Sequence, residues 1–440
     1  MININTMELP ITPREACSYV QFQTDNFGIF FDMDRCLELT AILQLEMTSI
    51  LKEMRRLSNS PNLFVEKDYV IDALVKMGVA KGAFVGANGK TSLTAATCKL
   101  IADDPKAVPE ARRMAEIYAT YTSNKRNKGN IENYATQLPM SVALSKKGHR
   151  MTIGNPTWKL LNTSRIAASD PGIQGIPRSM GDIVCEPKGY TLVRCDSGQI
   201  EPRINASAYL KDKLLMALIG LYNDAYFGTL HYCLLTDEEF YRLSQNVPDD
   251  LKPMNLTDDI KDQRQNIKRL TNAGAYGSTN LGDINPRLAD VYNKRIVNHP
   301  SRKALELNVR DSVHRGIETF YGYFGTPVTP DSTEKYQKGG SGWNEHVIRC
   351  GINNPIQTTA SELMMFSINE ARKIISEAKD THICFYKHDE ACFYVSDEDM
   401  ANGIGDKLSD VTAYQVEGWL PIYADALIGV KKGDYPSYII

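Results

Sequence analysis

Two short apolar runs, each leading to an aspartate, constrain this chain more than any other feature. The first run, Tyr190–Cys195, leads directly to Asp196, and the second, Ile383–Tyr386, ends shortly before Asp389. Runs of this length and content predict buried strands, so each carboxylate is expected at the tip of a strand. Two such tips side by side would bind hard divalent cations, which relieve carboxylate repulsion and activate a nucleophilic oxygen. The pair therefore points to phosphoryl transfer.

The residues around these aspartates resemble the motifs of a known family. Five blocks of the chain, in the same order, look like those of the family A DNA polymerases, the bacterial DNA polymerase I type. They are Arg165–Pro177 (RIAASDPGIQGIP), Asp196–Arg203 (DSGQIEPR), Arg264–Gly277 (RQNIKRLTNAGAYG), Arg349–Ala360 (RCGINNPIQTTA) and Lys387–Glu390 (KHDE). Five blocks in one order are far more specific than any single motif.

The resemblance implies an α+β fold of the right-hand polymerase type, with an antiparallel-sheet palm and a helical thumb and fingers. The expected domains are an N-terminal segment packing on the palm (1–30), the thumb (31–145), the first part of the palm (146–205), the fingers (206–345) and the second part of the palm (346–440). Apolar spacing separately predicts a helix from Asp34 to about Leu57 and a second helix ended by Gly78. Because the thumb-like stretch comes almost at the start, a proofreading exonuclease is expected to be missing.

The implied activity is that of a DNA-directed DNA polymerase, which adds deoxynucleotides to a primer 3′-hydroxyl by a two-metal-ion mechanism. Asp196 and Asp389 would hold two Mg²⁺ ions, or Mn²⁺ in their place, about 3.5 to 4 Å apart. The backbone carbonyl of Ser197 would complete one metal site, and Glu390 is a further catalytic candidate that supports the pair. A single H-D-E triplet is more often an ordinary hairpin, so only the joint pattern favours catalysis.

A basic helix supplies the predicted nucleotide site. Arg264, Lys268 and Asn272 recur every four residues, with Tyr276 one step further, so they share one helix face, for which a solvated basic face is the alternative. The resemblance assigns Arg264 and Lys268 to the triphosphate. It assigns Tyr276 to the template base, and Glu201 together with Tyr276 to the gate that excludes a 2′-hydroxyl.

The remaining site residues also carry over from the motifs. Gln199 belongs to the nucleotide site, as does His388 near the primer terminus, although a simple turn histidine is the alternative for His388. Residues expected to contact DNA are Arg165, Gln174, Asn353 and Gln357 on the minor groove and template, Arg349 beside the active site, and Lys90, Thr91 and Ser92 at the thumb tip.

Some positions depart from the family pattern. Asn272 stands where the family has Phe or Tyr against the sugar ring, and Thr358 replaces a glycine. In the Asp196 block, Ser197, Gly198 and Pro202 replace Tyr, Ser and Leu. Because Asn272 removes an aromatic platform, we expect discrimination at the 3′ position of the sugar to differ from that of relatives with the aromatic residue.

Charge and composition limit the partners. The expected partners are primer–template DNA and dNTPs, yet the formal net charge is −3, whereas phosphate contacts favour basic proteins. Lysines and arginines cluster at 125–128, 146–150 and 264–269. These clusters are compatible with a basic cleft within an acidic exterior, although a solvated charged face explains any one of them equally well.

The setting is expected to be intracellular. The sequence has no long uncharged apolar run, so no membrane-spanning helix is expected, and its nine cysteines form no C-x-x-C pair, which favours reduced, buried thiols. The short form resembles polymerases of phages or mobile elements, and a phage origin would place it in the cytoplasm of a bacterial host. A monomer is expected.

Three other classes of protein share some of these features. Gly86–Ser92 suggests a phosphate-binding P-loop, but that motif needs a glycine where Phe84 stands, and a buried strand before it. A catalytically silent DNA-binding relative would lack one of the metal aspartates, and both are present. A reverse transcriptase or single-subunit RNA polymerase would share the palm; Glu201 favours DNA as the product, while the type of template stays open.

Overall fold

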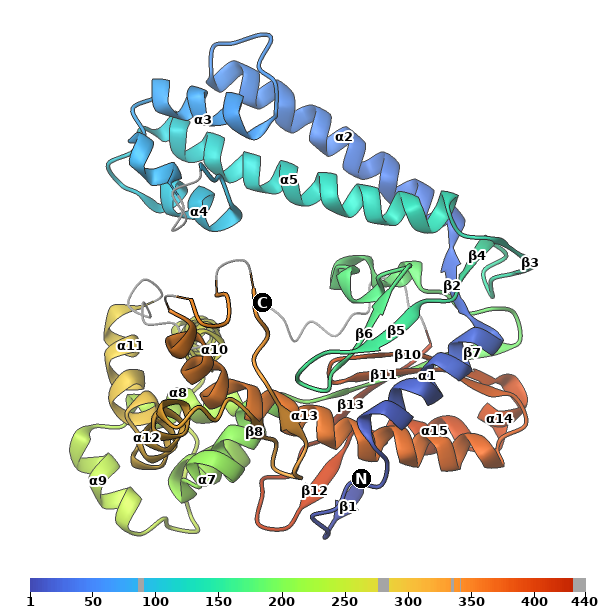
Figure 1. The fold of residues 1–440 in the computed structure, drawn as a ribbon. Coiled ribbons are helices and arrows are strands. Elements are labelled where there is room, and N and C mark those ends of the chain that lie inside the picture. The colour runs from blue at the N-terminus through green and yellow to red at the C-terminus, as the bar shows by residue number, and fades with distance from the viewer. Residues whose placement is uncertain (86–90, 276–284, 334–335, 341, 430–440) are drawn as a thin grey trace. The chain divides into compact units, whose positions relative to one another are not determined.

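The computed structural model describes residues 1–85, 91–275, 285–333, 336–340 and 342–429 of the 440-residue chain (Figure 1). The chain forms two compact units. The larger unit comprises residues 1–28, 155–170 and 189–440, and the smaller unit comprises residues 29–154 and 171–188. Across the described residues, no helix combines the length and the apolar content needed to cross a bilayer.

The smaller unit is built on two long helices that lie side by side (Figure 1). These are α2 (Met33–Leu57) and α5 (Pro109–Thr136), and they pack with α3 (Lys67–Lys76), the 3-10 turn η1 (Lys81–Phe84) and α4 (Ala95–Asp103). The sheet of this unit has the order β2 (Ile29–Asp32), β4 (Arg150–Gly154), β3 (Met140–Leu144). The short helical turns η2 (Ile173–Gly175) and η3 (Arg178–Ile183) complete it.

The start of α2 differs by a residue or two from the expectation. The helix begins at Met33, and the capping residue is Asp32, whose carboxylate accepts a hydrogen bond from the Arg35 backbone N–H at 2.8 Å. Asp34, the expected start, instead accepts from the backbone N–H of Arg150 at 3.0 Å. The predicted second helix is confirmed as α3, and Gly78 follows it with a φ of +93°, a conformation that favours glycine.

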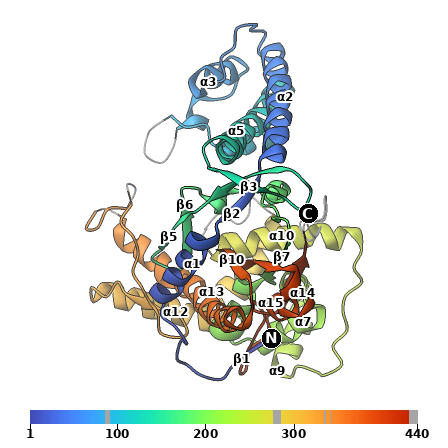
Figure 2. The same cartoon turned by 90° about the vertical axis from the view of Figure 1, so that its right-hand side faces the viewer.

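The larger unit is organised around a four-stranded antiparallel sheet. Its strand order is β10 (Thr381–Lys387), β11 (Glu390–Ser396), β7 (Tyr190–Ser197), β13 (Ala424–Ile428). Figures 1 and 2 both show α13 (Trp343–Glu377), α14 (Asp397–Ala401) and α15 (Ile404–Ser409) on one side of this sheet. The thiol of Cys195 on β7 reaches the Leu408 carbonyl on α15 at 3.4 Å, which shows how closely the layers pack.

Short elements complete the larger unit. The remaining pairs of strands are β1 (Ile2–Ile4) with β12 (Tyr414–Val416), β5 (Thr157–Leu160) with β6 (Ile166–Ser169), and β8 (Phe320–Tyr321) with β9 (Pro327–Val328). The other helices are α1 (Pro13–Phe27), α6 (Ile200–Ile204), the π-helical turn η4 (Asn205–Leu210), α7 (Lys213–Tyr222), α8 (Ala225–Leu234), α9 (Asp237–Gln245), α10 (Asp258–Ala275), α11 (Pro286–Tyr292), the π-helical turn η5 (Asn293–Val297) and α12 (Pro300–His314).

Helices and an antiparallel sheet in one unit confirm the expected α+β fold. The expected helical content between residues 206 and 345 is also observed. All nine cysteines are free thiols, and only Cys350 is not fully buried, as expected for reduced core residues. The stretch that suggested a P-loop falls mostly on residues 86–90, which lie outside the described residues.

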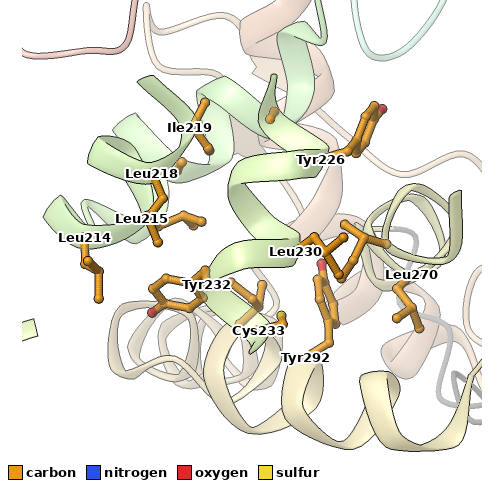
Figure 3. Packing of buried hydrophobic residues seen from close by; sticks show 14 of the residues in the cluster. Leu214, Leu215, Leu218, Ile219, Tyr226, Leu230, Tyr232, Cys233, Leu270 and Tyr292 are labelled. Carbon is orange, nitrogen blue, oxygen red and sulfur yellow. The ribbon is translucent and has the colours of Figure 1, made fainter. Parts of the chain in front are cut away.

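Helices α7 and α8 share an apolar cluster that supports the neighbouring α10. Leu214, Leu215, Leu218 and Ile219 on α7 face Leu230, Tyr232 and Cys233 on α8, with Leu270 and Tyr292 closing the cluster (Figure 3). The two helices approach each other closely at Gly228, where an added β-carbon would lie 2.5 Å from the Cα and 2.6 Å from the N of Ile219. Only glycine fits at this crossing.

We therefore expect Gly228→Ala to lower the free energy of unfolding by about 1–3 kcal/mol, because the obstructing atoms are backbone and the helices must separate. Denaturant unfolding followed by circular dichroism measures the change. Gly129→Ala on α5 is the matched control: nothing lies within 4 Å of its β-carbon position. It should be stabilising by about 0.5–1 kcal/mol through helix propensity. Equal stability of the two variants would contradict the close crossing.

Candidate active site

The register of the central sheet brings the two predicted aspartates together. Asp196 is the penultimate residue of β7, and Glu390, the first residue of β11, lies directly opposite it. The backbone N–H of Ser197 donates to the carbonyl oxygen of Asp389 at 2.9 Å. Segments far apart in the sequence therefore meet at one end of the sheet. The hydroxyl of Ser197 is buried and donates to the Thr412 carbonyl at 2.9 Å, so the metal role predicted for Ser197 would fall to its backbone oxygen.

Asp389 lies in a tight turn rather than at the end of a strand. Lys387 and Glu390 pair across β10 and β11, which leaves His388 and Asp389 as the turn. His388 adopts a φ of +58°, and its imidazole is exposed. Partial desolvation and then the positive charges of Arg165 and Lys387 lower the pKa of His388, so its ring is neutral at pH 7.

The carboxyl group of Asp389 has a raised pKa. Desolvation, together with the negative charges of Glu201 and Glu390, raises the pKa of Asp389 to about 6, against the opposing charge of Arg165. Burial therefore disfavours the ionised form of Asp389. A bound cation would favour that form, because it stabilises the carboxylate charge.

Two of the predicted acids are already paired with arginines. Glu390 forms an ion pair with Arg194, whose Nε donates at 2.7 Å and whose Nη2 also donates. Glu201 forms an ion pair with the Nη2 of Arg165. Glu201, predicted to exclude the 2′-hydroxyl, and Arg165, predicted to contact the minor groove, therefore hold each other in place. Arg194 was missed by the sequence reasoning, although its position two residues before Asp196 puts it on the same strand face.

Helix α10 carries the predicted phosphate-binding residues. Arg264 donates to Asp224 through Nη2 at 2.6 Å and through Nε at 3.2 Å. Lys268 lies with its Nζ 5.8 Å from the ring centre of Tyr226. Asn272 is exposed on the same helix, and Tyr276 lies outside the described residues. The predicted helix face is thus present as far as the structure describes it.

Gln199 connects the end of the central sheet to Asp224, which in turn accepts from Arg264 on α10. It adopts a left-handed φ of +56° just after β7, donates from Nε2 to Asp224 at 2.9 Å and accepts from the backbone N–H of Ala225. Asp224 is the capping residue of α8, with its Oδ1 accepting from the Phe227 backbone N–H at 2.7 Å. Sequence reasoning assigned no role to Asp224, although an aspartate directly before a helix is a recognisable capping signal.

Arg203, at the end of the Asp196 block, fastens the loops around the site. Its side chain is buried and donates to the carbonyls of Gly198 at 3.1 Å, Pro421 at 3.0 Å and Asn223 at 2.9 Å. Three segments that are distant in the sequence share one guanidinium, whose several fixed donors suit this task. Burial lowers the pKa of Arg203 from its ordinary value, opposed by the negative charge of Asp224.

Three predicted DNA contacts follow one another along α13. Arg349, Asn353 and Gln357 recur every four residues, so they lie on one helix face. Asn353 is buried, and its side-chain oxygen has no hydrogen-bond partner in the part of the chain that the structure describes. The guanidinium of Arg349 lies 5.2 Å from the ring centre of Tyr336.

The other predicted DNA contacts belong to the smaller unit. Gln174 lies on η2 and is half-buried. Thr91 pairs with Val85 in an isolated bridge, and the backbone N–H of Ser92 donates to the Phe84 carbonyl at 2.6 Å. Lys90 lies outside the described residues. These residues belong to the smaller unit, whereas the acidic residues Asp196, Asp389 and Glu390 belong to the larger unit.

The residues at the acidic site fit a magnesium centre. Asp196, Asp389 and a backbone carbonyl are hard oxygen donors, and the pKa of Asp389 is raised chiefly by burial, a cost that a bound cation would offset. Among the described residues, no group of three or more His, Cys, Asp or Glu side chains is arranged to hold an ion by itself. Mg²⁺ commonly takes one or two carboxylates and completes its shell with water and substrate phosphates, so the two aspartates and one carbonyl are a sufficient set of protein donors.

Comparison with known proteins relates the chain to one group of enzymes. No protein-family model matches it. DNA polymerase I of Pseudomonas aeruginosa is 25% identical over 343 residues, which cover 74% of this chain and 33% of the relative. The chain thus spans about a third of the length of that curated relative.

The fold has a counterpart among solved structures. The polymerase domain of Pol1 from M. smegmatis, in complex with DNA primer-template and dNTP, matches with a TM-score of 0.70 and 14% identity. The match covers 94% of this chain and 69% of that one, and it shows a shared fold. The chain is thus similar in sequence to a bacterial DNA polymerase I, and it shares the fold of a polymerase domain.

Proposed function

We propose that this chain is a template-directed DNA polymerase that adds deoxynucleotides to the 3′-hydroxyl of a primer. The observation that carries the proposal is the meeting of Asp196 and Asp389 at one end of the central sheet, through the Ser197 N–H to Asp389 carbonyl bond of 2.9 Å. The nearby basic residues of α10 add a surface for an anionic substrate. The solved relative, a polymerase in complex with primer-template and dNTP, supports the same substrates here.

Asp196 and Asp389, with the backbone carbonyl of Ser197, would hold two divalent cations, Mg²⁺ or Mn²⁺. When bound, such ions make the primer hydroxyl a better nucleophile and neutralise the charge of the pyrophosphate that leaves. Glu390 would support the pair from the opposite strand, where Arg194 keeps its carboxylate oriented. The ionised form of Asp389 is the one needed for this role, and a cation favours it.

The chain's own side chains would orient the reactants. Arg264 and Lys268 would bind the triphosphate, Arg264 through forked donors and Lys268 as a point charge. Glu201 would pack against the sugar and exclude a 2′-hydroxyl, with Gln199 holding the adjacent turn. Positioning of this kind contributes much of the rate in phosphoryl transfer, because little covalent chemistry is left to the protein.

The remaining roles follow the resemblance. Arg165, Gln174, Arg349, Asn353 and Gln357 would contact the minor groove and the template, and Lys90, Thr91 and Ser92 would contact the duplex from the thumb. Asn272 and Tyr276 would line the sugar and template base, and His388 would lie near the primer terminus. We also propose the domains as 1–30 on the palm, 31–145 thumb, 146–205 and 346–440 palm, and 206–345 fingers. We also propose that the protein is an intracellular, phage-like monomer and that it works without proofreading.

Asp196→Asn and Asp389→Asn should each lower primer extension by about 100-fold or more, because each loses a charged oxygen ligand while keeping its shape. Extension of a labelled primer on a DNA template, with dNTPs and Mg²⁺, measures the effect. Asp406→Asn is the matched control, since Asp406 is exposed in the first turn of α15. Undiminished synthesis by either active-site variant, with a wild-type melting temperature, would overturn the mechanism.

Glu201→Ala should raise the incorporation of ribonucleotides relative to deoxynucleotides by about 10- to 100-fold, because the proposed barrier to the 2′-hydroxyl is removed. Single-nucleotide extension with dNTP and NTP gives the ratio. Glu377→Ala, at the exposed end of α13, is the control. A ratio that Glu201→Ala leaves unchanged would refute the sugar gate. A wild-type enzyme that prefers NTPs would instead favour an RNA polymerase.

The lack of proofreading is tested separately. A 3′-labelled single strand of DNA should stay intact when it is incubated with this chain and Mg²⁺. Release of labelled nucleotides would contradict this part of the proposal. If Asp196→Asn and Asp389→Asn abolish polymerase activity but not this release, the exonuclease site lies elsewhere in the chain.

A further inference from the structure

The guanidinium of Arg264 is already occupied on several sides. Its Nε and Nη2 donate to Asp224, and its centre lies 5.2 Å from the ring centres of both Tyr226 and Phe227. Figure 3 shows Tyr226 at the edge of the apolar cluster to which it belongs, with its hydroxyl outermost. Arg264 is thus held between aromatic rings and a carboxylate, and it is half-buried.

Asp224 is a firmly placed, ionised partner. It caps α8 through the Phe227 backbone N–H at 2.7 Å, and it accepts from Gln199 Nε2 at 2.9 Å. Burial alone would raise the pKa of Asp224, but hydrogen bonds from Arg264 and Phe227 hold it below the ordinary value. The carboxylate is therefore charged at neutral pH, and its position is fixed by α8 rather than by α10.

A carboxylate and a phosphate make the same demand on a guanidinium. Both accept forked hydrogen bonds from a pair of its N–H groups, so they compete for the same donors. A triphosphate that approached Arg264 would also meet the negative charge of Asp224 at close range. Full engagement of Arg264 by the nucleotide therefore requires the Asp224 contact to open.

We infer that Asp224 is an internal competitor of the nucleotide triphosphate for Arg264, and that it sets the affinity of the enzyme for nucleotide by holding α10 against α8. The inference rests on the proposed function. Asp224 acts through Arg264, so it is a positioning residue. Only ligands with enough phosphate charge displace Asp224 from Arg264. The observed affinity for nucleotide is lower when a larger fraction of the molecules has Arg264 paired with Asp224.

Asp224→Asn tests this inference, because asparagine keeps the oxygen that caps α8 and removes the charge that holds Arg264. The dissociation constant for the correct dNTP is measured on a complex with a dideoxy-terminated primer and its template, in Mg²⁺. We expect it to fall about 5-fold, the change that the loss of one internal charge-assisted pair predicts. Simple structural damage would weaken binding, so a gain in affinity is diagnostic.

Asp212→Asn is the matched control. Asp212 caps the adjacent helix α7 through the Leu215 backbone N–H at 2.9 Å and contacts His299 rather than α10. It should leave the dissociation constant unchanged. Arg264→Lys removes the forked donors. In this background, adding Asp224→Asn should change the dissociation constant for dNTP little, since the two residues act as a pair.

The outcomes separate this inference from the proposed function. If the wild-type complex binds no dNTP, the proposed function fails. If the wild type binds dNTP and Asp224→Asn binds it no more tightly than Asp212→Asn does, the inference is overturned while the function stands. An undiminished effect in the Arg264→Lys background also overturns it. Should Asp224→Asn melt far below the wild type, Asp224→Ser, which retains a capping oxygen, takes its place under the same criteria.

Discussion

The pairing of β7 with β11 is the constraint on which the rest of the site depends. This antiparallel ladder sets Glu390 opposite Asp196, and its last bond joins the Ser197 N–H to the Asp389 carbonyl. A slip of one residue would turn every side chain of β7 to the other face, so Asp196 would point into the helices that cover the sheet. The buried apolar residues of β7 and β11 oppose such a slip, and the core therefore also fixes the position of the acids.

Within the larger unit, the charges of the site are balanced mostly by its own ion pairs. Arg194 with Glu390, Arg165 with Glu201, and Arg264 with Asp224 each bring together residues from different elements. Removing one member of a partly buried pair leaves the other charge uncompensated, so such pairs hold the site in a defined arrangement even where their net stabilisation is small.

Sequence reasoning succeeded where the signal was local or belonged to a motif. The apolar runs before Asp196 and Asp389 form strands, and the four-residue spacing of Arg264 and Lys268 does lie on a helix. It erred in detail where several residues compete for one local role. Asp32, not Asp34, caps α2, because hydrogen bonding in the folded chain decides between neighbours in the sequence.

The sequence by itself determined the class of fold, the order of the motifs and the identity of the acidic pair, since periodicity and motif spacing are properties of the chain alone. Only the tertiary structure decided which cation meets which acid. Arg194 reaches Glu390, and Asp224 reaches Arg264, across separations that no local pattern encodes. The physical reason is that such contacts arise from packed elements at a fixed distance and angle, and these are set by the core as a whole rather than by neighbouring residues.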